Sequence, residues 1–533
     1  MQVRKRDGSL QEFDKNKIAQ AIIKANNDTE AYYKIYEGDI DAMVDEIIAE
    51  VIPPLHRSES DYEVLVDIEE IQDAVELCLQ REGYYVLAKN YIKYRYQREL
   101  ARAFGKRDES ILSLIRGTND ELRTENSNKN VTLASTQRDY MAGEVAKDLA
   151  QRLLLPKHIV DAHNNGVLHF HDMDYSPAQP LFNCCLINIG DMLDNGTCVN
   201  GTKIDSPSSF PTACTIVTQI IASVASGQYG GQSVNVKHLG KYLKRSYDKY
   251  NRMFEHRDLA WALMMKDLHD GVQTIQYQIN TISCTNGQTP FVTLFLELDP
   301  KDEYLPYTAM IIEEILQQRI KGVKNEVGAW VTPTFPKLVY VLDECNNLSG
   351  GEYDYLTHLA AECTAKRMYP DYISAKKMRE HYQGNVFSPM GCRSFLSPWK
   401  DADGEYKFEG RFNQGVVTIN LPQIALEVMP HINWTVEGMT EEQIWERDLD
   451  FFKEELDHRL QLCFDALMCR HKALLGTKSD ISPIHWQHGA IARLGKGEVI
   501  DPLLFGYYST ISLGYIGLYE VTKLMTGEQH TSG

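Results

Sequence analysis

The chain has 533 residues and a formal net charge of −19, with 74 acidic against 55 basic side chains. This length exceeds one ordinary domain, and the 43% hydrophobic content is typical of a folded protein. The acidic charge argues against binding to polymeric nucleic acid. The sequence contains no apolar run of about twenty residues, the length needed to cross a membrane. The N-terminus lacks the apolar stretch of a secretory signal. Eleven scattered cysteines without a C-x-x-C pair indicate a reducing cytoplasm.

Residues 1–98 are predicted to form a small, mostly helical domain. The Asp7-Gly8 pair predicts a tight hairpin. Apolar residues at helical spacing predict helices over residues 14–26, 39–51, 67–80 and 84–102. Lys5, Arg6 and Lys17 place cations on the hairpin and the first helical turn, where a polyphosphate could bind. A solvated basic face is the alternative.

Residues 99–130 are polar and charged and predict a linker, after which residues 131–533 predict an α/β domain. Helices are expected over 140–155, 210–227, 235–252, 304–321, 354–368 and 440–474. Short apolar runs that suggest strands lie at 167–172, 185–190, 290–298, 338–344 and 415–421. The alternation indicates substantial parallel sheet.

Two cysteine positions differ from the rest. Cys392 lies in SPMGCRSFLSPW, where glycine and prolines predict an irregular loop that displays its thiol, so catalytic and structural roles carry equal weight. In a strand, the adjacent Cys184 and Cys185 point to opposite faces, so one can face a cavity while the other packs. The remaining cysteines in helical patterns are expected to be buried and inert, namely Cys78, Cys214, Cys363, Cys463 and Cys469.

Three further segments carry polar candidates. Ser512 and Gly514 precede a helical run, so their backbone N–H groups could hold a substrate triphosphate, but a serine cap with a glycine turn is an equal alternative. His169 and His171 alternate along a strand, which predicts a polar cavity wall rather than a metal site. The glycine-rich segment 226–233 is expected to be mobile.

The first domain resembles the ATP-cone, an allosteric domain that binds ATP or dATP. The resemblance rests on V-x-K-R-D-G at residues 3–8, K-I-x-x-A-I at 17–22 and A-K-x-Y-I-x-Y-R at 88–95. It implies phosphate contacts at Lys5, Arg6 and Lys17, and packing of the base near Val3 and Ile18.

The rest of the chain resembles the anaerobic, class III ribonucleoside-triphosphate reductases. The resemblance rests on Asn183-Cys184, the PMGCRSFL loop, and residues 410–426 and 488–522. It implies a ten-stranded α/β barrel of two five-stranded half-sheets, and reduction of ribonucleoside triphosphates to deoxyribonucleotides by radical chemistry. Cys392 would take the ribose 3′ hydrogen and Cys184 would deliver hydrogen from the other face. Asn413 matches the asparagine of formate-using members, or merely closes a turn before a strand.

The resemblance also implies cofactors and partners. ATP would activate the enzyme and dATP would inhibit it, with deoxynucleoside triphosphates as further effectors. A radical S-adenosylmethionine enzyme would install a glycyl radical, and the chain would form a homodimer that the cone could assemble into a tetramer. The family's R-x-C-G-Y motif and zinc cysteine pairs are not found in this sequence, so either the sequence stops before the radical and zinc domain or that domain is absent, and no metal is expected in this chain. The alternatives are another glycyl-radical enzyme or a non-catalytic nucleotide-sensing protein.

Overall fold

The chain divides into two compact units, residues 1–113 and 114–533, which are described separately. The computed structural model describes residues 2–5, 9–51, 65–96, 98, 112–113, 130, 132–285, 287–391, 394–432, 440–529 and 531. Two predicted site residues, Arg6 and Cys392, lie outside these described residues, as does most of the predicted linker.

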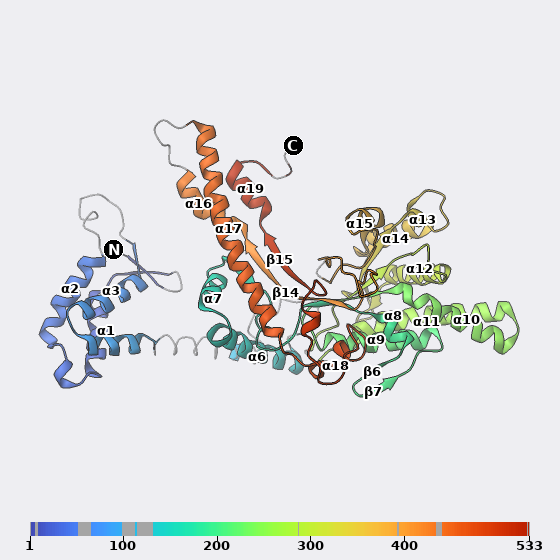
Figure 1. The fold of residues 1–533 in the computed structure, drawn as a ribbon, viewed down its shortest axis with the longest axis horizontal. Coiled ribbons are helices and arrows are strands. Elements are labelled where there is room, and N and C mark those ends of the chain that lie inside the picture. Colours follow the sequence, from blue (N-terminus) through green and yellow to red (C-terminus); the bar gives the residue numbers. More distant parts are fainter. Residues whose placement is uncertain are drawn as a thin grey trace. The chain divides into compact units, whose positions relative to one another are not determined.

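The first unit combines a small sheet with helices (Figure 1). Strand β1 (Gln2–Arg4) pairs antiparallel with β2 (Leu10–Glu12) and parallel with β3 (Leu65–Asp67). The helices are α1 (Lys15–Asn27), α2 (Ile40–Val51) and α3 (Ile68–Arg81), and residues 85–96 are also helical. The predicted hairpin and helices are therefore confirmed to within a few residues wherever the structure describes them. Asp14 caps α1 by accepting a hydrogen bond from the backbone N–H of Asn16.

The second unit is built on an eight-stranded sheet. Its strands are β4 (Leu168–Phe170), β5 (Cys184–Leu186), β8 (Gln232–Asn235), β9 (Val292–Leu296), β12 (Lys337–Leu342), β13 (Asp371–Ser374), β14 (Arg411–Asn420) and β15 (Thr510–Ile516). Their order is β13-β12-β9-β8-β5-β14-β15, and β4 pairs with β14.

The strand directions define a parallel half-sheet and a change of direction beside it. The five strands from β13 to β5 are parallel, β14 runs antiparallel to β5, and β15 runs parallel to β14. One parallel five-stranded half-sheet is thus present, as expected for an α/β fold. In the part of the chain that the structure describes, the other side contains only β14, β15 and the antiparallel β4, so the ten-stranded barrel is not seen there.

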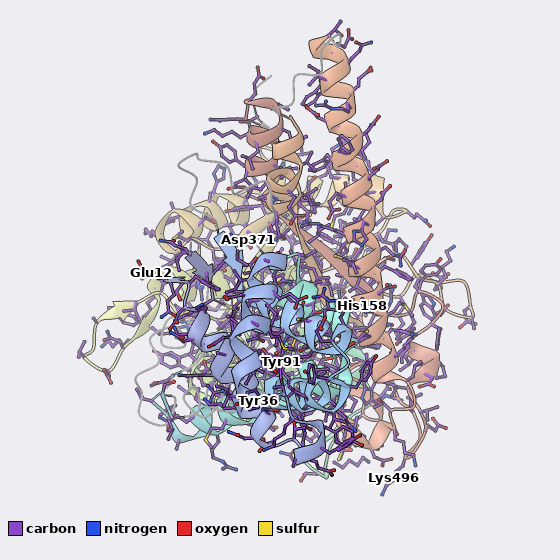
Figure 2. The ribbon with its side chains drawn as sticks, turned by 90° about the vertical axis from the view of Figure 1, so that its left-hand side faces the viewer. Glu12, Tyr36, Tyr91, His158, Asp371 and Lys496 are labelled. Atoms are coloured by element: carbon purple, nitrogen blue, oxygen red, sulfur yellow. The ribbon has the colours of Figure 1, made fainter. Side chains whose placement is uncertain are left out.

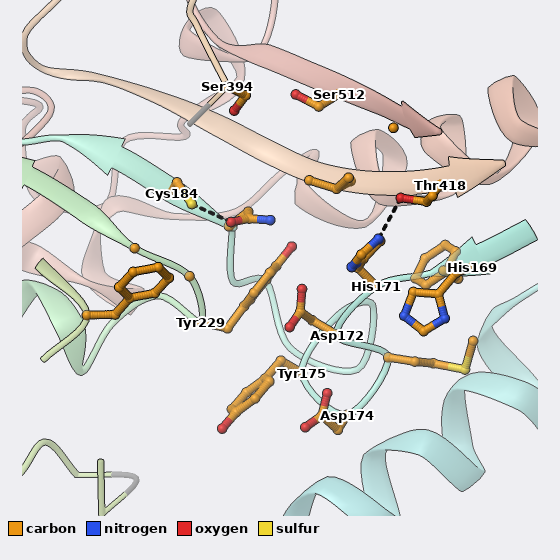
Figure 3. Close-up of a pocket in the computed structure, with 18 of the residues that line it drawn as sticks. His169, His171, Asp172, Asp174, Tyr175, Cys184, Tyr229, Ser394, Thr418 and Ser512 are labelled. Carbon is orange, nitrogen blue, oxygen red and sulfur yellow. Dashed lines mark hydrogen bonds between the residues drawn. The ribbon is translucent and has the colours of Figure 1, made fainter. Parts of the chain in front are cut away.

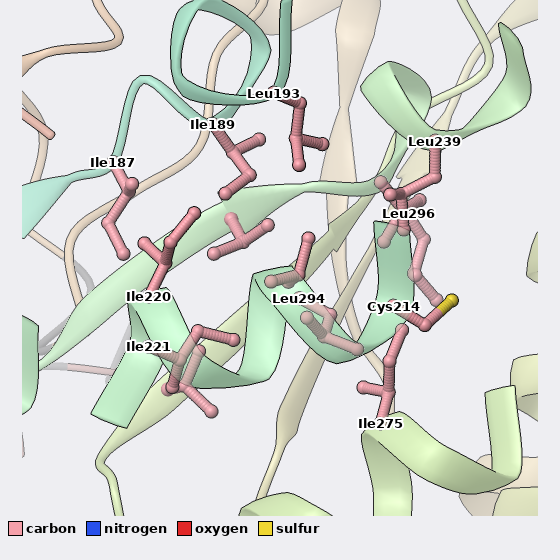
Figure 4. Close-up of a cluster of buried hydrophobic side chains, with 14 of the residues drawn as sticks. Ile187, Ile189, Leu193, Cys214, Ile220, Ile221, Leu239, Ile275, Leu294 and Leu296 are labelled. Atoms are coloured by element: carbon pink, nitrogen blue, oxygen red, sulfur yellow. The ribbon is translucent and has the colours of Figure 1, made fainter. Parts of the chain in front are cut away.

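Helices cover the parallel half-sheet. They include α9 (Phe210–Ala225), α10 (Gly240–Phe254), α11 (Arg257–Thr281), α12 (Leu305–Lys321) and α14 (Asp354–Arg367). Helix α9 is apolar on nearly all sides because it is buried, and Figure 4 shows its Cys214, Ile220 and Ile221 in one cluster with Leu294 and Leu296 of β9. Each such side chain contributes about 1.5–3 kcal/mol on burial.

A second group of helices packs against β14 and β15. The 34-residue α17 (Glu441–Leu474) contacts both strands and lies beside α16 (Leu421–Ile432), which in turn contacts α19 (Leu518–Thr526) (Figure 1). No helix in the described ranges is long and apolar enough to cross a membrane. The helical cysteines Cys78, Cys214, Cys363 and Cys463 are buried as predicted, whereas Cys469 is half-buried.

Candidate active site

A cavity of about 810 Å³ lies where the parallel half-sheet meets strands β14 and β15. The parallel strands reach it with residues at or just before their first positions, namely Asn183, Cys184, Gly230, Gly231, Phe291 and Lys337. The cavity is also lined by Val416 and Thr418 of β14, by Ser512 and Gly514 of β15, and by the segment after β4. Figure 3 shows Cys184 and the histidines at opposite ends of this cavity.

The adjacent cysteines have different surroundings, as their strand position predicts. Cys184 lines the cavity and its thiol lies 2.5 Å from the side-chain oxygen of Asn183. Cys185 points into the hydrophobic core, where burial raises the pKa of its thiol. Leu186, Phe387, Met390 and Leu396 pack with Cys184 in an apolar cluster. Cys184 is therefore at a polar cavity but is backed by side chains that exclude water.

Asn413 lies beside Cys184 within the sheet, because the two residues are register partners on β14 and β5. Its side-chain amide donates to the Ser512 hydroxyl at 2.5 Å, and its oxygen accepts from the backbone N–H of Gly415 at 2.8 Å. It is the third residue of β14, next to a break in register with β15, so the alternative of a turn before the strand is wrong. Asn413 is buried behind the cavity wall and Ser512 stands in front of it.

Ser512 and Gly514 both line the cavity, but for a different reason from the predicted one. They lie inside strand β15, and α19 begins only at Leu518 after Gly517. The expected position at a helix start, and the alternative of a serine cap with a glycine turn, are therefore wrong. Contact of Ser512 and Gly514 with a substrate triphosphate stays a prediction. Position 514 favours glycine because a β-carbon there would lie 2.7 Å from the Thr418 hydroxyl.

The predicted polar wall of His169 and His171 is confirmed, and the fold adds His163 to it. The rings of His169 and His171 are 4.4 Å apart, and His171 Nε2 lies 2.7 Å from the Thr418 hydroxyl. Burial first, then His169 and the Arg470 cation, lowers the pKa of His171 to about 4. His171 is therefore neutral at pH 7. The described residues contain no group of three or more His, Cys, Asp or Glu side chains that could hold a metal ion.

Arg470 of α17 lies directly behind this wall, and nothing in the sequence pattern singles it out. It is 1% exposed, its guanidinium is 3.9 Å from the centre of the Phe170 ring, and within the described residues it makes no ion pair and its Nε has no hydrogen-bond partner. It donates to the Tyr229 hydroxyl at 3.1 Å and also to the backbone oxygen of His171. Arg470 thus joins two segments of the cavity wall and places a positive charge behind them.

The first unit has its own cavity, of about 280 Å³, between α1 and helical residues 85–96. Its lining residues are Lys17, Gln20, Ala21, Lys24, Gln72, Tyr91, Tyr94, Arg95 and Arg98. Tyr91 is labelled among the helices of this unit in Figure 2. Among the predicted nucleotide contacts, Lys17 lines this cavity, Val3 and Ile18 belong to the hydrophobic core, and Lys5 is exposed.

The cationic and aromatic residues of the last helix were not among the predicted nucleotide contacts, although part of that helix carries the resemblance. Arg98 lies over the Tyr94 ring, with 6.0 Å between the guanidinium carbon and the ring centre. Arg95 pairs with Glu69, Asp73 and Glu76, so most of its charge is already compensated. Lys17, Lys24 and Arg98 are the cations best placed to meet phosphates, and the aromatic residues offer faces for a base.

Comparison with known proteins assigns both units. Residues 125–533 match the family described as anaerobic ribonucleoside-triphosphate reductase, and residues 1–100 match the ATP cone domain. The chain belongs to the anaerobic ribonucleoside-triphosphate reductase family and carries an ATP-cone. This assignment favours a reductase over the two alternatives of another glycyl-radical enzyme and a non-catalytic sensor.

Individual relatives agree with this assignment. The anaerobic ribonucleoside-triphosphate reductase of Escherichia coli is 36% identical over 540 residues, covering 99% of this chain and 70% of the relative. That of bacteriophage T4 is 42% identical over 430 residues, covering 78% of this chain and 67% of the relative. A crystal structure of the Thermotoga maritima anaerobic ribonucleotide reductase with dATP and CTP matches with a TM-score of 0.52 at 15% identity, over 80% of this chain and 68% of that one. The last likeness concerns the fold alone.

Proposed function

We propose that this protein reduces ribonucleoside triphosphates to 2′-deoxyribonucleoside triphosphates, with formate as the external reductant. Family membership supports ribonucleotide reduction and allosteric control. The observation that carries the proposal is the position of Cys184. Cys184 lines the cavity and contacts Gly230. The next residue, Gly231, contacts Gly391, which precedes Cys392 in the sequence. In the proposed reaction Cys392 takes the ribose 3′ hydrogen, and Cys184 supplies hydrogen at the opposite face.

The surroundings of Cys184 suit radical chemistry. A sulfur-centred reaction needs a site that holds the sugar close and excludes water, because side reactions quench radicals. The apolar cluster of Leu186, Met390 and Leu396 provides that exclusion on one side of Cys184. The glycyl radical of the family, when present, supplies the oxidising equivalent, and this chain's residues bind and orient the ribose. The activating partner is proposed to be a radical S-adenosylmethionine enzyme, and the assembly a homodimer.

Formate is supported by an amide rather than a carboxylate at Asn183, the hydrogen-bond partner of Cys184, and at Asn413, its register partner on β14. An amide can donate or accept a hydrogen bond without repelling an anion. The direct test is anaerobic activation followed by CTP reduction with ¹³C-formate. We expect one labelled carbon dioxide for each dCTP formed. Turnover that requires a dithiol and consumes no formate would reject formate but leave the reductase assignment intact.

Effector control through the first unit is proposed to depend on the cavity between α1 and residues 85–96. Arg98→Ala should weaken ATP and dATP binding about tenfold, because a charged contact to phosphate is lost. The measurement is the dATP concentration for half-inhibition of the activated enzyme, together with calorimetric dATP binding to the same chain. Lys93→Ala is the matched control, because Lys93 is exposed on the same helix and does not line the cavity. Equal behaviour of both variants would place the effector site elsewhere.

A further inference from the structure

The Gly230-Gly231 pair at the entry to β8 lies between two segments of the active site. One neighbour is Asn183-Cys184 at the start of β5, and the other is Pro389–Gly391, which leads into Cys392 in the sequence. Neither glycine has a positive φ angle, so backbone conformation does not explain the choice of glycine. The lack of room for a side chain at both positions does explain it.

Gly230 has no room for a side chain on the Cys184 side. A β-carbon there would lie 2.2 Å from the Asn183 side-chain oxygen and 2.8 Å from the Cys184 sulfur. Its backbone N–H donates to the Asn183 carbonyl at 2.7 Å. The backbone of β8 is therefore held in direct contact with the residue pair that carries the cavity-facing thiol.

Gly231 has no room on the opposite side. A β-carbon there would lie 2.9 Å from the Cα atom of Gly391, and a β-carbon on Gly391 would lie 2.8 Å from the Cα atom of Gly231. Both contacts are to backbone, which cannot swing aside as a flexible side chain can. The two chain segments therefore meet glycine against glycine.

Hydrogen bonds hold this arrangement on both sides of the contact. The hydroxyl of Ser233, which is 2% exposed, donates to the Pro389 carbonyl at 2.8 Å. The side-chain amide of Gln228 donates to the carbonyls of Gly230 and Gly231 at 3.1 and 2.9 Å. The segment 226–233, predicted from sequence to be a mobile loop, thus ends in a fixed, buried strand entry.

We propose that Gly230 and Gly231 are positioning residues that set the separation between Cys184 and the Pro389–Gly391 segment, with Ser233 fixing that segment along the strand. This inference rests on the proposed function, because it gives the two glycines a role only if the residue after Gly391 acts together with Cys184. Cys392 follows Gly391 in the sequence, and consecutive Cα atoms are about 3.8 Å apart, so the position of Gly391 limits where the next residue can be held.

The test is Gly231→Ala in the activated enzyme. The added methyl should move Pro389–Gly391 away from β8 and lower kcat about 100-fold, because hydrogen transfer is sensitive to misplacement of about 1 Å. The KM for CTP should change less than twofold, since the rest of the cavity wall is retained. Gly495→Ala is the matched control, because its β-carbon would meet only the side chain of the exposed Glu498.

Two measurements separate this effect from general disruption. Backbone amide exchange should become faster in residues 387–391 and 394–397, where the Met390 N–H donates to the Ser394 carbonyl, and stay unchanged in residues 411–420. Ser233→Ala, which adds no bulk, should lower kcat about tenfold with an unchanged KM. Unchanged kcat in both variants would overturn the inference while leaving the reductase function in place. Absence of CTP reduction by the wild-type enzyme would instead overturn the proposed function.

Discussion

Replacing Cys184 with alanine should lower kcat for ribonucleoside-triphosphate reduction by about 10²–10⁴-fold, the range for loss of a positioned proton or hydrogen donor. The thiol lies in the cavity wall with Asn183 as its hydrogen-bond partner, and it faces the Pro389–Gly391 segment across the glycine pair. Removing Cys392 should abolish turnover as well. The decisive measurement is single-turnover dCTP formation by the activated enzyme, with CTP affinity measured separately. Affinity should remain within a factor of about 2, because neither thiol supplies charge to the phosphates.

Cys185→Ala is the matched control for this prediction. Cys185 is the next residue of the same strand, fully buried in the core among Phe182, Ile187 and other apolar side chains. Its loss should leave kcat nearly unchanged and lower the free energy of unfolding by about 1 kcal/mol, as expected for a small core truncation. If the two variants lost activity equally, or if Cys184→Ala remained active, the assignment of Cys184 as hydrogen donor would be wrong.

The sequence predicts the helices of the first unit and the long helices α9, α12, α14 and α17 of the second, but the 25-residue α11 was not predicted. It predicts strands best where they are apolar. β9 and β12 are buried, continuous apolar runs, which is why they are recognisable. β15 escaped prediction because its apolar residues Ile511 and Leu513 are exposed rather than buried, while the small residues Ser512 and Gly514 line the cavity. A glycine within a strand is a signal for a turn, and here it makes room for Thr418 instead.

Residues of the site were predictable where the local sequence pattern determines which way they face. They were not predictable where the site depends on contacts between distant segments. The alternation of His169 and His171 and the opposite faces of Cys184 and Cys185 follow from strand geometry, and both are confirmed. The Ser512 contact with Asn413 joins residues 99 positions apart and has no local signal. Of the phosphate contacts that the resemblance implies in the first unit, Lys17 lines the cavity between two helices, and those at Lys5 and Arg6 stay predictions.

Arg470 shows most clearly what a helical pattern conceals. Charged residues recur along the 34-residue α17, and a charge there is normally solvated. The Arg470 side chain instead points into the protein and packs against Gly415. A β-carbon at position 415 would lie 2.5 Å from the arginine Cδ, so a larger residue there would block it. A buried cation without a carboxylate is costly unless its hydrogen bonds compensate, and Tyr229 and the His171 carbonyl provide two of them. This cost suggests that the charge serves the cavity.

Arg470→Met should therefore lower kcat about 100-fold, because the two cavity segments lose their common tether and shift. It should also raise the pKa of His171. Burial remains the main cause of the lowered pKa, but the repulsion from Arg470 disappears. The measurements are steady-state kinetics and a pH titration of ¹³C-labelled histidine by NMR. The free energy of unfolding should change little at pH 7, since lost hydrogen bonds are offset by removal of a buried charge.

The lowered pKa of His171 also makes the stability of the folded protein depend on pH. Because the pKa of His171 is about 4 in the folded protein and about 6.5 when unfolded, the unfolded chain binds the extra proton between these values. His171 therefore makes the folded protein less stable as pH falls from 6.5 towards 4, and Arg470→Met should reduce that loss. Arg459→Met is the matched control, a buried arginine of the same helix that pairs with Glu427 and Glu455. It should lower stability but leave kcat and the His171 titration unchanged. An unchanged His171 titration in Arg470→Met would show that the Arg470 charge does not reach the cavity.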